Sequence, residues 1–177
     1  MKGYKGFNID LSCRPGSRGY MKYEIGRTYS IMEDPVMCER GFHFCRRIVD
    51  VFGWYCPNMD TRVCEVEAIG KVMTSKDLAK YVTDRIRIVR ELSTAELKAA
   101  AVEAGQWRDV KDAVRRSIYH FVQSPHEYVL WAQDYHLYKC TDKDVVALQK
   151  REDEWMQVLK EDEEPKRKND YDRKRSL

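Results

Sequence analysis

The chain has no long apolar run and no closely paired cysteines, and these absences exclude several classes of protein. No stretch approaches the roughly 20 apolar residues that a membrane-spanning helix requires, and residues 1–10 lack the apolar core of a signal peptide. The six cysteines form no C-x-x-C pair, which argues against a zinc knuckle. We therefore expect a cytoplasmic protein without a membrane segment, in which Cys45 and Cys64 are small buried apolar residues.

The motifs of common nucleotide and metal enzymes are also missing. There is no Walker sequence and no G-x-G-x-x-G, which argues against a nucleotide kinase or a Rossmann enzyme. His120, His126 and His136 follow neither H-x-x-x-H nor H-E-x-x-H, so we expect no metal site. The net charge of +3 is too small for a dedicated nucleic-acid-binding domain, and such contact is expected only through the basic C-terminal tail.

The apolar residues change their spacing near residue 92, which predicts two kinds of structure in one chain. A length of 177 residues suits one domain with an appendage, and a hydrophobic content of 43% is enough for a core. Before residue 92, short segments alternate apolar and polar side chains and predict strands. These strands are expected over 41–45, 62–69 and 85–89, with short helices over 46–55 and 75–81.

After Glu91 the apolar residues recur at helical spacing. Ser93 and Glu96 form the pattern of a capping box, which predicts a helix that ends at Gly105. A second helix with one continuous apolar side is expected over 107–123.

Two more helices are predicted before a charged C-terminus. Ser124 as N-cap and Pro125 at the first helical position predict the third helix. Its inward-facing candidates are Tyr128, Trp131, Tyr135 and Tyr138. The fourth helix is expected to begin at Thr141 or Asp142, and from Glu161 onward the chain is almost wholly charged, which predicts disorder. The resulting division is a β-rich domain over 1–92, a helical appendage over 93–160 and a disordered charged tail over 161–177.

Six short phrases follow one another in the first half of the chain. They are Y-K-G-F-N (4–8), Y-E-I-G-R-T-Y (23–29), C-E-R-G-F-H-F-C (38–45), D-V-F-G-W-Y (50–55), E-V-E-A-I-G (65–70) and T-D-R-I-R-I-V-R-E-L (83–92). In order and spacing they resemble a widespread phage and prophage domain family of unknown function. The resemblance implies a bacteriophage or mobile-element origin, and therefore a protein of the host cytoplasm, but it implies no activity.

Three phrases are also similar to strands of the ADP-ribosyltransferase fold. Lys5-Gly6 stands where those enzymes end an early strand in His-Gly or Arg-Gly. Residues 41–45 resemble a later Gly-Ile-Tyr-Phe-Ala strand, with His43 at the Tyr position, and residues 65–70 resemble a Gly-Glu-Val-Ala-Leu-Gly strand. The fold class that we expect is thus α+β: a small split β core resembling the ADP-ribosyltransferase fold, followed by a three- to four-helix C-terminal appendage.

This second resemblance implies roles for particular residues. Trp54 or Tyr55 would stack on the nicotinamide of NAD, and Gly6 would let the backbone approach the ligand closely. Asp84 would take the place of the catalytic Glu that stabilises the oxocarbenium-like transition state. Because Asp84 is shorter than Glu and Lys5 replaces His or Arg, a ligand binder without catalysis is also compatible with the sequence.

Each candidate has a structural interpretation as well. His43 can be a satisfied core histidine, Trp54 and Tyr55 can be core aromatics, and Asp84 can cap a turn.

Three functional classes follow from these observations. The first is a phage accessory protein that binds a nucleotide or NAD-like ligand through Lys5, Gly6, His43, Trp54 and Tyr55. The second is an active ADP-ribosyltransferase that modifies a host target, with Lys5 and Asp84 as catalytic residues. The third is a non-enzymatic interaction protein, such as an inhibitor of a host defence factor, that acts through its helices. A cleft at the predicted site residues favours the first two classes, whereas a filled core there and exposed apolar helix faces favour the third.

Overall fold

A seven-stranded antiparallel sheet and four α-helices make up the protein, for which the computed structural model describes residues 1–13, 21–75, 79–131 and 137–163. The sheet has the strand order β4-β9-β6-β1-β5-β8-β7. Its strands are β1 (Lys2–Phe7), β4 (Thr28–Ser30), β5 (Phe42–Cys45), β6 (Arg62–Ala68), β7 (Val72–Ser75), β8 (Lys80–Thr83) and β9 (Arg85–Glu91). The α+β class is confirmed, although one continuous sheet stands where we expected a small split β core.

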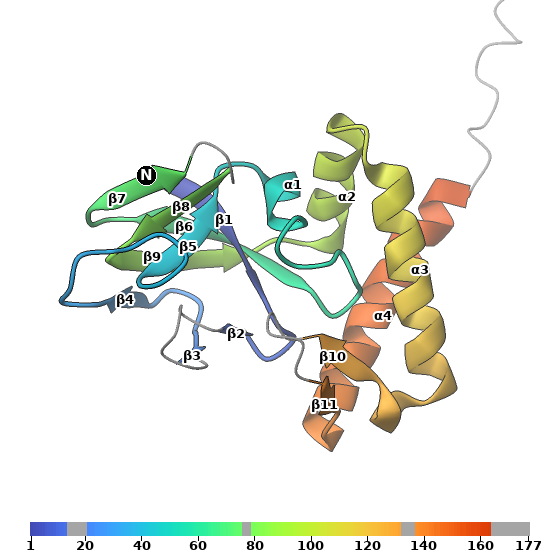
Figure 1. Cartoon of the computed structure of the whole chain (residues 1–177). Helices are drawn as coiled ribbons and strands as arrows, with labels where there is room; N and C mark the ends of the chain where they lie inside the picture. The colour runs from blue at the N-terminus through green and yellow to red at the C-terminus, as the bar shows by residue number, and fades with distance from the viewer. Residues whose placement is uncertain (14–20, 76–78, 132–136, 164–177) are drawn as a thin grey trace, which may run out of the picture.

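The helices gather at one end of the sheet, with α1 and α2 nearest to it and α3 and α4 outermost (Figure 1). They are α1 (Ile48–Val51), α2 (Thr94–Glu103), α3 (Trp107–Gln123) and α4 (Asp142–Glu163), with one 3-10 turn, η2 (Pro125–Glu127). Two small ribbons pair β2 (Ser12–Cys13) with β3 (Met21–Lys22) and β10 (Val129–Trp131) with β11 (Leu137–Lys139). No helix in the described part of the chain is long and apolar enough to cross a membrane.

The alternating segments form the centre of the sheet. In β6, Val66 and Ala68 are buried, and in β9 Ile86 and Ile88 are buried while Arg87 is exposed. Successive side chains of a strand point to opposite faces, so this alternation gives the sheet one apolar face at these strands. The predicted strands over 62–69 and 85–89 are therefore confirmed.

The start and end of α2 follow the predicted local signals. The Glu96 N–H donates to Ser93 Oγ (3.2 Å), and the Ser93 N–H donates to the Glu96 carboxylate (2.9 Å), which completes the capping box. After α2 the chain turns at Gly105 with φ +69°, a left-handed conformation that glycine adopts without a steric cost.

The prediction of a third helix after Ser124 is wrong. Pro125–Glu127 form a single 3-10 turn, and the backbone leaves the helical region at Tyr128 (φ −59°, ψ 125°). Strand β10 then pairs with β11, so strand pairing with residues further along the chain replaces the helix that the local cap signal predicted. Of the four expected inward-facing residues, Tyr128 is buried, and Tyr135 lies outside the described residues.

Three other element boundaries differ from the prediction. The segment 75–81 was expected to be helical, but Ser75 ends β7 and Lys80 begins β8, and these two residues pair across an antiparallel hairpin. Helix α1 covers only Ile48–Val51 rather than 46–55, and its buried residues are Val49 and Val51. Helix α4 runs two residues past the expected start of the charged tail, and positions 164–177 lie outside the described residues.

The helices and the sheet share one hydrophobic core. Buried apolar residues from the sheet, such as Phe7 and Ile88, belong to the same cluster as Leu97, Phe121 and Trp155 of the helices. Three consecutive residues before β6 also form hydrogen bonds with the helical half. The bonds run from Met59 N to Ser117 Oγ (2.9 Å), from Tyr128 OH to Asp60 Oδ1 (2.9 Å) and from Arg151 Nη2 to Thr61 O (3.2 Å). We call this contact the 59–61 seam.

The buried Asp60 predicts a pH dependence of stability. Burial raises the pKa of Asp60 to about 6, although the hydrogen bond from Tyr128 and the charge of Arg151 oppose the rise. The pKa of Asp60 in the folded state lies above the unfolded value of about 3.9. Between about pH 4 and pH 6 the Asp60 carboxyl group therefore keeps its proton in the folded protein and loses it in the unfolded one. The free energy of unfolding thus falls as the pH rises through this range. Asp60→Asn keeps an oxygen acceptor for Tyr128 and removes the titration.

We expect Asp60→Asn to raise the free energy of unfolding relative to wild type more at pH 7.5 than at pH 4. The difference between the two pH values should be at most about 3 kcal/mol, the free energy of a shift of about two pKa units. Urea unfolding of both proteins at both pH values measures it. A variant whose stability relative to wild type is the same at both pH values would contradict the burial of a titrating carboxyl group in the 59–61 seam.

Candidate functional site

Lys5, the first predicted ligand contact, lies inside the protein. It is on β1, and only 8% of its surface is exposed. Its Nζ donates to the main-chain carbonyl of His43 (2.9 Å) and lies 5.5 Å from the ring centroid of Phe7 and 5.8 Å from that of Tyr23. The Lys5 ammonium group therefore links β1 to β5 and contacts aromatic rings of the core.

Gly6 and Tyr55 are in direct contact. A Cβ atom placed on Gly6 would lie 2.4 Å from Tyr55 Cδ2 and 2.9 Å from Val51 Cγ1. Tyr55 itself is buried. The space beside Gly6 is thus filled by the side chains of Val51 in α1 and of Tyr55 just after it, which approach the Gly6 backbone closely.

His43 is a neutral histidine with its ring nitrogens engaged in the fold. Burial, together with the positive charges of Lys5 and Lys80, lowers the pKa of His43 to about 3, while a hydrogen bond with the Gly41 backbone opposes the shift. The Cys38 N–H donates to His43 Nε2 (2.9 Å). The imidazole ring therefore fixes the loop before β5.

Trp54 lies beside a lysine that the sequence did not single out. Lys80 Nζ lies 3.9 Å from the centroid of the Trp54 ring and 3.9 Å from Cys38 Sγ. Only 8% of Lys80 is exposed, and burial lowers its pKa. We call Cys38, His43, Trp54 and Lys80 the lysine–thiol cluster. Its assembly depends on the pairing of β5 with β8, so no spacing along the chain could have revealed it.

Asp84, the expected counterpart of a catalytic Glu, caps a turn. Its Oδ1 accepts a hydrogen bond from the Lys71 N–H (2.8 Å), just after β6. A Cβ atom at Gly70 would lie 1.8 Å from the same oxygen, so this turn requires glycine. Among the predicted site residues, Lys5 thus bonds to His43, and Gly6 contacts Tyr55. Trp54 is connected to His43 only indirectly, through Lys80 and Cys38. Asp84 lies apart from these contacts, at the turn after β6.

Of the predicted ligand residues, Trp54 borders a surface hollow. A groove of about 580 Å³ lies between α1 and the start of α3. It is lined by Trp54 with Phe52 and Pro57, and by polar side chains that include Asp50, Gln106 and Asp109. Its volume is within the range of small-molecule sites, but its two carboxylates disfavour a phosphate group.

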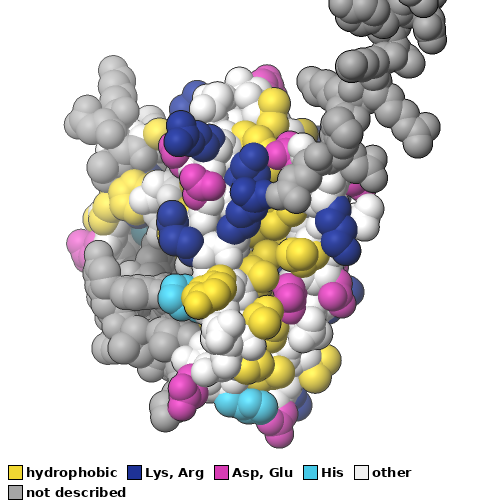
Figure 2. Space-filling model, turned by 90° about the vertical axis from the view of Figure 1, so that its right-hand side faces the viewer, with side chains coloured by type: hydrophobic (Ala, Val, Ile, Leu, Met, Phe, Trp, Pro, Cys, Tyr) yellow, Lys and Arg dark blue, Asp and Glu magenta, His cyan; other side chains and the backbone are white. Residues whose placement is uncertain are grey.

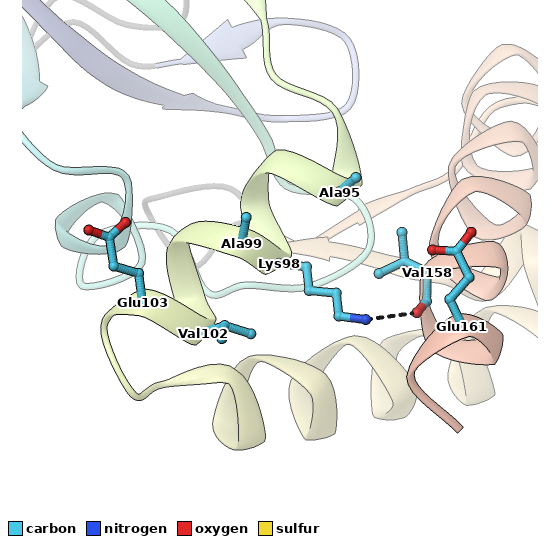
Figure 3. Close-up of a pocket in the computed structure, with 7 residues that line it drawn as sticks. All are labelled: Ala95, Lys98, Ala99, Val102, Glu103, Val158 and Glu161. Atoms are coloured by element: carbon cyan, nitrogen blue, oxygen red, sulfur yellow. Dashed lines mark hydrogen bonds between the residues drawn. The ribbon is translucent and has the colours of Figure 1, made fainter. Parts of the chain in front are cut away.

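A larger cavity of about 670 Å³ lies beside the C-terminal part of α3. Arg116, His120 and Gln123 of α3 line it together with Asn58 and Glu127. A narrower groove of about 370 Å³ runs between α2 and α4 (Figure 3). It is lined mainly by alanine and valine side chains, and Lys98 reaches across it to the Val158 carbonyl (3.4 Å).

The exposed side of α3 carries basic and apolar side chains together. From Ala113 to Gln123 the helix has no acidic residue. Tyr119 is 63% exposed and Val122 is 54% exposed, and Arg115, Arg116 and His120 are exposed around them. We call these five residues the α3 surface.

The fold is that of an α+β protein, in which helices gather at one end of an antiparallel sheet. Residues 1–100 match the family of a domain of unknown function, DUF7666, and the chain belongs to this family. The match covers the sheet and ends inside α2, so α3 and α4 lie beyond it. No curated protein and no solved structure matches the chain. The phage origin and the resemblance to ADP-ribosyltransferases stay predictions.

Exchange of two glycines tests whether Gly6 faces the core or a ligand. We expect Gly6→Ala to lower the free energy of unfolding by about 1–3 kcal/mol, because the added methyl group overlaps the Tyr55 ring. Gly53→Ala is the matched control, since the nearest atom to its added Cβ is Asp50 O at 3.5 Å. Denaturant unfolding measures both variants. Equal stability of Gly6→Ala and wild type would show that Tyr55 does not fill this space.

Proposed function

We propose that the protein is a non-enzymatic interaction protein that binds an acidic partner protein through the α3 surface. The observation that carries this proposal is the contrast between the predicted ligand residues and the α3 surface. Lys5, Gly6 and Tyr55 are packed into the core. On α3, by contrast, the large apolar side chains of Tyr119 and Val122 are exposed beside basic residues.

The residue types of the α3 surface suit a protein contact. Tyrosine and arginine are enriched among the side chains that dominate the energy of protein interfaces. Tyr119 offers a large rigid ring, and Arg115 and Arg116 follow one another three to four residues before it, so they lie within one turn of the ring. In Figure 2, hydrophobic side chains run down the middle of the face that α3 and α4 form, and most Lys and Arg side chains in view lie in its upper half.

Charge determines the class of partner. The C-terminal part of α3 presents two arginines and a histidine without an acidic residue between them. Complementary potentials speed association and exclude partners of like charge. The cavity of about 670 Å³ beside Arg116 and His120 gives a partner side chain a place to enter. We therefore expect a partner segment with Asp or Glu next to an apolar residue. A phage-encoded protein that inhibits a host factor would bind its target in this way.

Selection from a random peptide library tests this proposal, because it does not require the partner protein itself. We expect the purified chain to enrich sequences with acidic residues beside a hydrophobic one. Tyr119→Ala/Arg116→Ala should weaken binding of these peptides at least about 10-fold, and added salt should weaken it further. Lys2→Ala/Met73→Ala, which removes an exposed basic and an exposed apolar side chain from the sheet, should bind as wild type does. Enriched peptides without acidic residues, or equal binding by the Tyr119/Arg116 variant, would overturn the proposal.

A second candidate function is the binding of a nucleotide or NAD-like ligand in the groove at Trp54. The observation that favours it is the position of the Trp54 ring, which contacts Lys80 and also lines the groove of about 580 Å³. A nicotinamide or adenine ring would stack on Trp54, and Gln106 would offer an amide for hydrogen bonding. The phosphate groups of such a ligand would lie away from the carboxylates of Asp50 and Asp109. The ADP-ribosyltransferase alternative depends on the same step, because transfer requires bound NAD.

Thermal unfolding with millimolar NAD or ADP-ribose checks the second candidate. A ligand present at 100 times its dissociation constant stabilises a protein by about 2.7 kcal/mol, which raises Tm by several degrees. We expect Trp54→Ala/His43→Ala to lose the ligand-induced rise, measured against the variant's own Tm without ligand. If neither ligand raises the Tm of the wild type, the groove does not bind this class of molecule.

A further inference from the structure

Cys38 and Lys80 bring a thiol and an amine together in the lysine–thiol cluster. The distance from Lys80 Nζ to Cys38 Sγ is 3.9 Å. Cys38 is exposed, whereas only 8% of Lys80 is exposed. A reagent from solvent therefore reaches the sulfur first, and the amine approaches the sulfur from inside the protein.

The loop before β5 holds Cys38 in an unusual conformation. Val36 and Arg40 form an isolated bridge, and Cys38 lies between them with φ +62°. A residue with a Cβ atom rarely adopts this region, and its conformation is fixed here by the hydrogen bond from the Cys38 N–H to His43 Nε2. The loop thus keeps the Cys38 side chain directed toward β8.

Lys80 is fixed by its strand and by Trp54. In the β5–β8 pair, Lys80 lies opposite Cys45, and its Nζ lies over the Trp54 ring. Within the described ranges, no carboxylate oxygen lies within 4.0 Å of this Nζ. Burial lowers the pKa of Lys80, which increases the share of neutral amine with a free lone pair. A neutral amine is the form that attacks an electrophilic sulfur.

We propose that Cys38 and Lys80 form a covalent modification site, in which oxidation by a peroxide joins Cys38 Sγ to Lys80 Nζ. In the first step the Cys38 thiol loses its proton, the thiolate attacks the peroxide and the O–O bond breaks. A sulfenic acid forms, and the hydroxide that leaves takes up the thiol proton to give one water. In the second step the Lys80 amine attacks this sulfur and the S–O bond breaks. The hydroxide that leaves takes a proton from the amine as a second water. One hydrogen peroxide is reduced to two waters, and the thiol and the amine lose two hydrogens.

The other cysteines lack this arrangement. Cys45 and Cys64 are buried, and burial raises their pKa to about 11 and about 12, so their thiols are protected. Cys56 is exposed, and its Sγ contacts Asn58 Oδ1 (3.3 Å) rather than an amine, although partial burial and the charge of Asp60 raise the pKa of its thiol. Cys56 is therefore an internal control for oxidation without a neighbouring lysine. The joined state would tie the loop before β5 to β8, next to Ala79 and Trp54 of the groove at Trp54.

Mass spectrometry of the full chain after treatment with hydrogen peroxide tests the proposal. We expect a species about 2 Da lighter than the untreated chain, whose tryptic map joins the Cys38 and Lys80 peptides and which dithiothreitol reverses. Cys56 should instead advance to the sulfinic acid, about 32 Da heavier. Lys80→Arg should abolish the joined peptide and leave Cys38 as a sulfinic acid.

Cys38→Ser, an exchange at an exposed position, provides a second variant if Lys80→Arg fails to fold. It should give no joined peptide and should leave oxidation of Cys56 unchanged. Oxidation of wild-type Cys38 to a sulfinic acid at the rate seen in Lys80→Arg would overturn the proposal. A disulfide between Cys38 and another cysteine would overturn it as well. A joined peptide about 14 Da heavier would also overturn it, because it would place an oxygen between the two atoms.

Discussion

The fold of this protein depends on the burial of the apolar residues of its helices in one core that they share with the sheet. Helices α2, α3 and α4 each bury part of their apolar residues, and such helices are stable only when they pack against a partner surface. Complete burial of side chains such as Phe121, Leu148 and Trp155 contributes about 1.5–3 kcal/mol each. The 59–61 seam adds directional hydrogen bonds to this apolar packing, because it joins the residues just before β6 to Ser117, Tyr128 and Arg151 of the helical half.

Two buried lysines give the sheet an unusual polar interior. Burial of an ammonium group costs free energy unless the group has a partner. The hydrogen bond from Lys5 Nζ to the His43 carbonyl offsets this cost for Lys5, and the contacts of Lys80 Nζ with the Trp54 ring and Cys38 Sγ offset it for Lys80. Burial, together with the charges of both lysines, lowers the pKa of His43 and keeps its ring neutral. Lys5 and His43, which resemble parts of a ligand site in the sequence, thus stabilise the contact of β1, β5 and β8.

Local signals predicted much of the fold. Alternation gave β6 and β9, the capping box gave α2, and the apolar side of residues 107–123 gave α3, because each of these patterns is contained within one segment. The structural interpretations also hold for His43 as a satisfied histidine and for Asp84 as a turn cap. The prediction of a helix after Ser124 was wrong, because the local cap signal competed with strand pairing that depends on residues beyond the turn.

The amino-acid sequence by itself determined the α+β class, the change from strands to helices near residue 92, and the burial of Cys45 and Cys64. The tertiary structure alone decided which residues meet. The strand order places β5 between β1 and β8, although residues 2–7, 42–45 and 80–83 are far apart in the chain. Contacts such as Lys80 with Cys38 follow from this order. They arise from long-range pairing and packing, which the spacing of residue types along one segment does not encode.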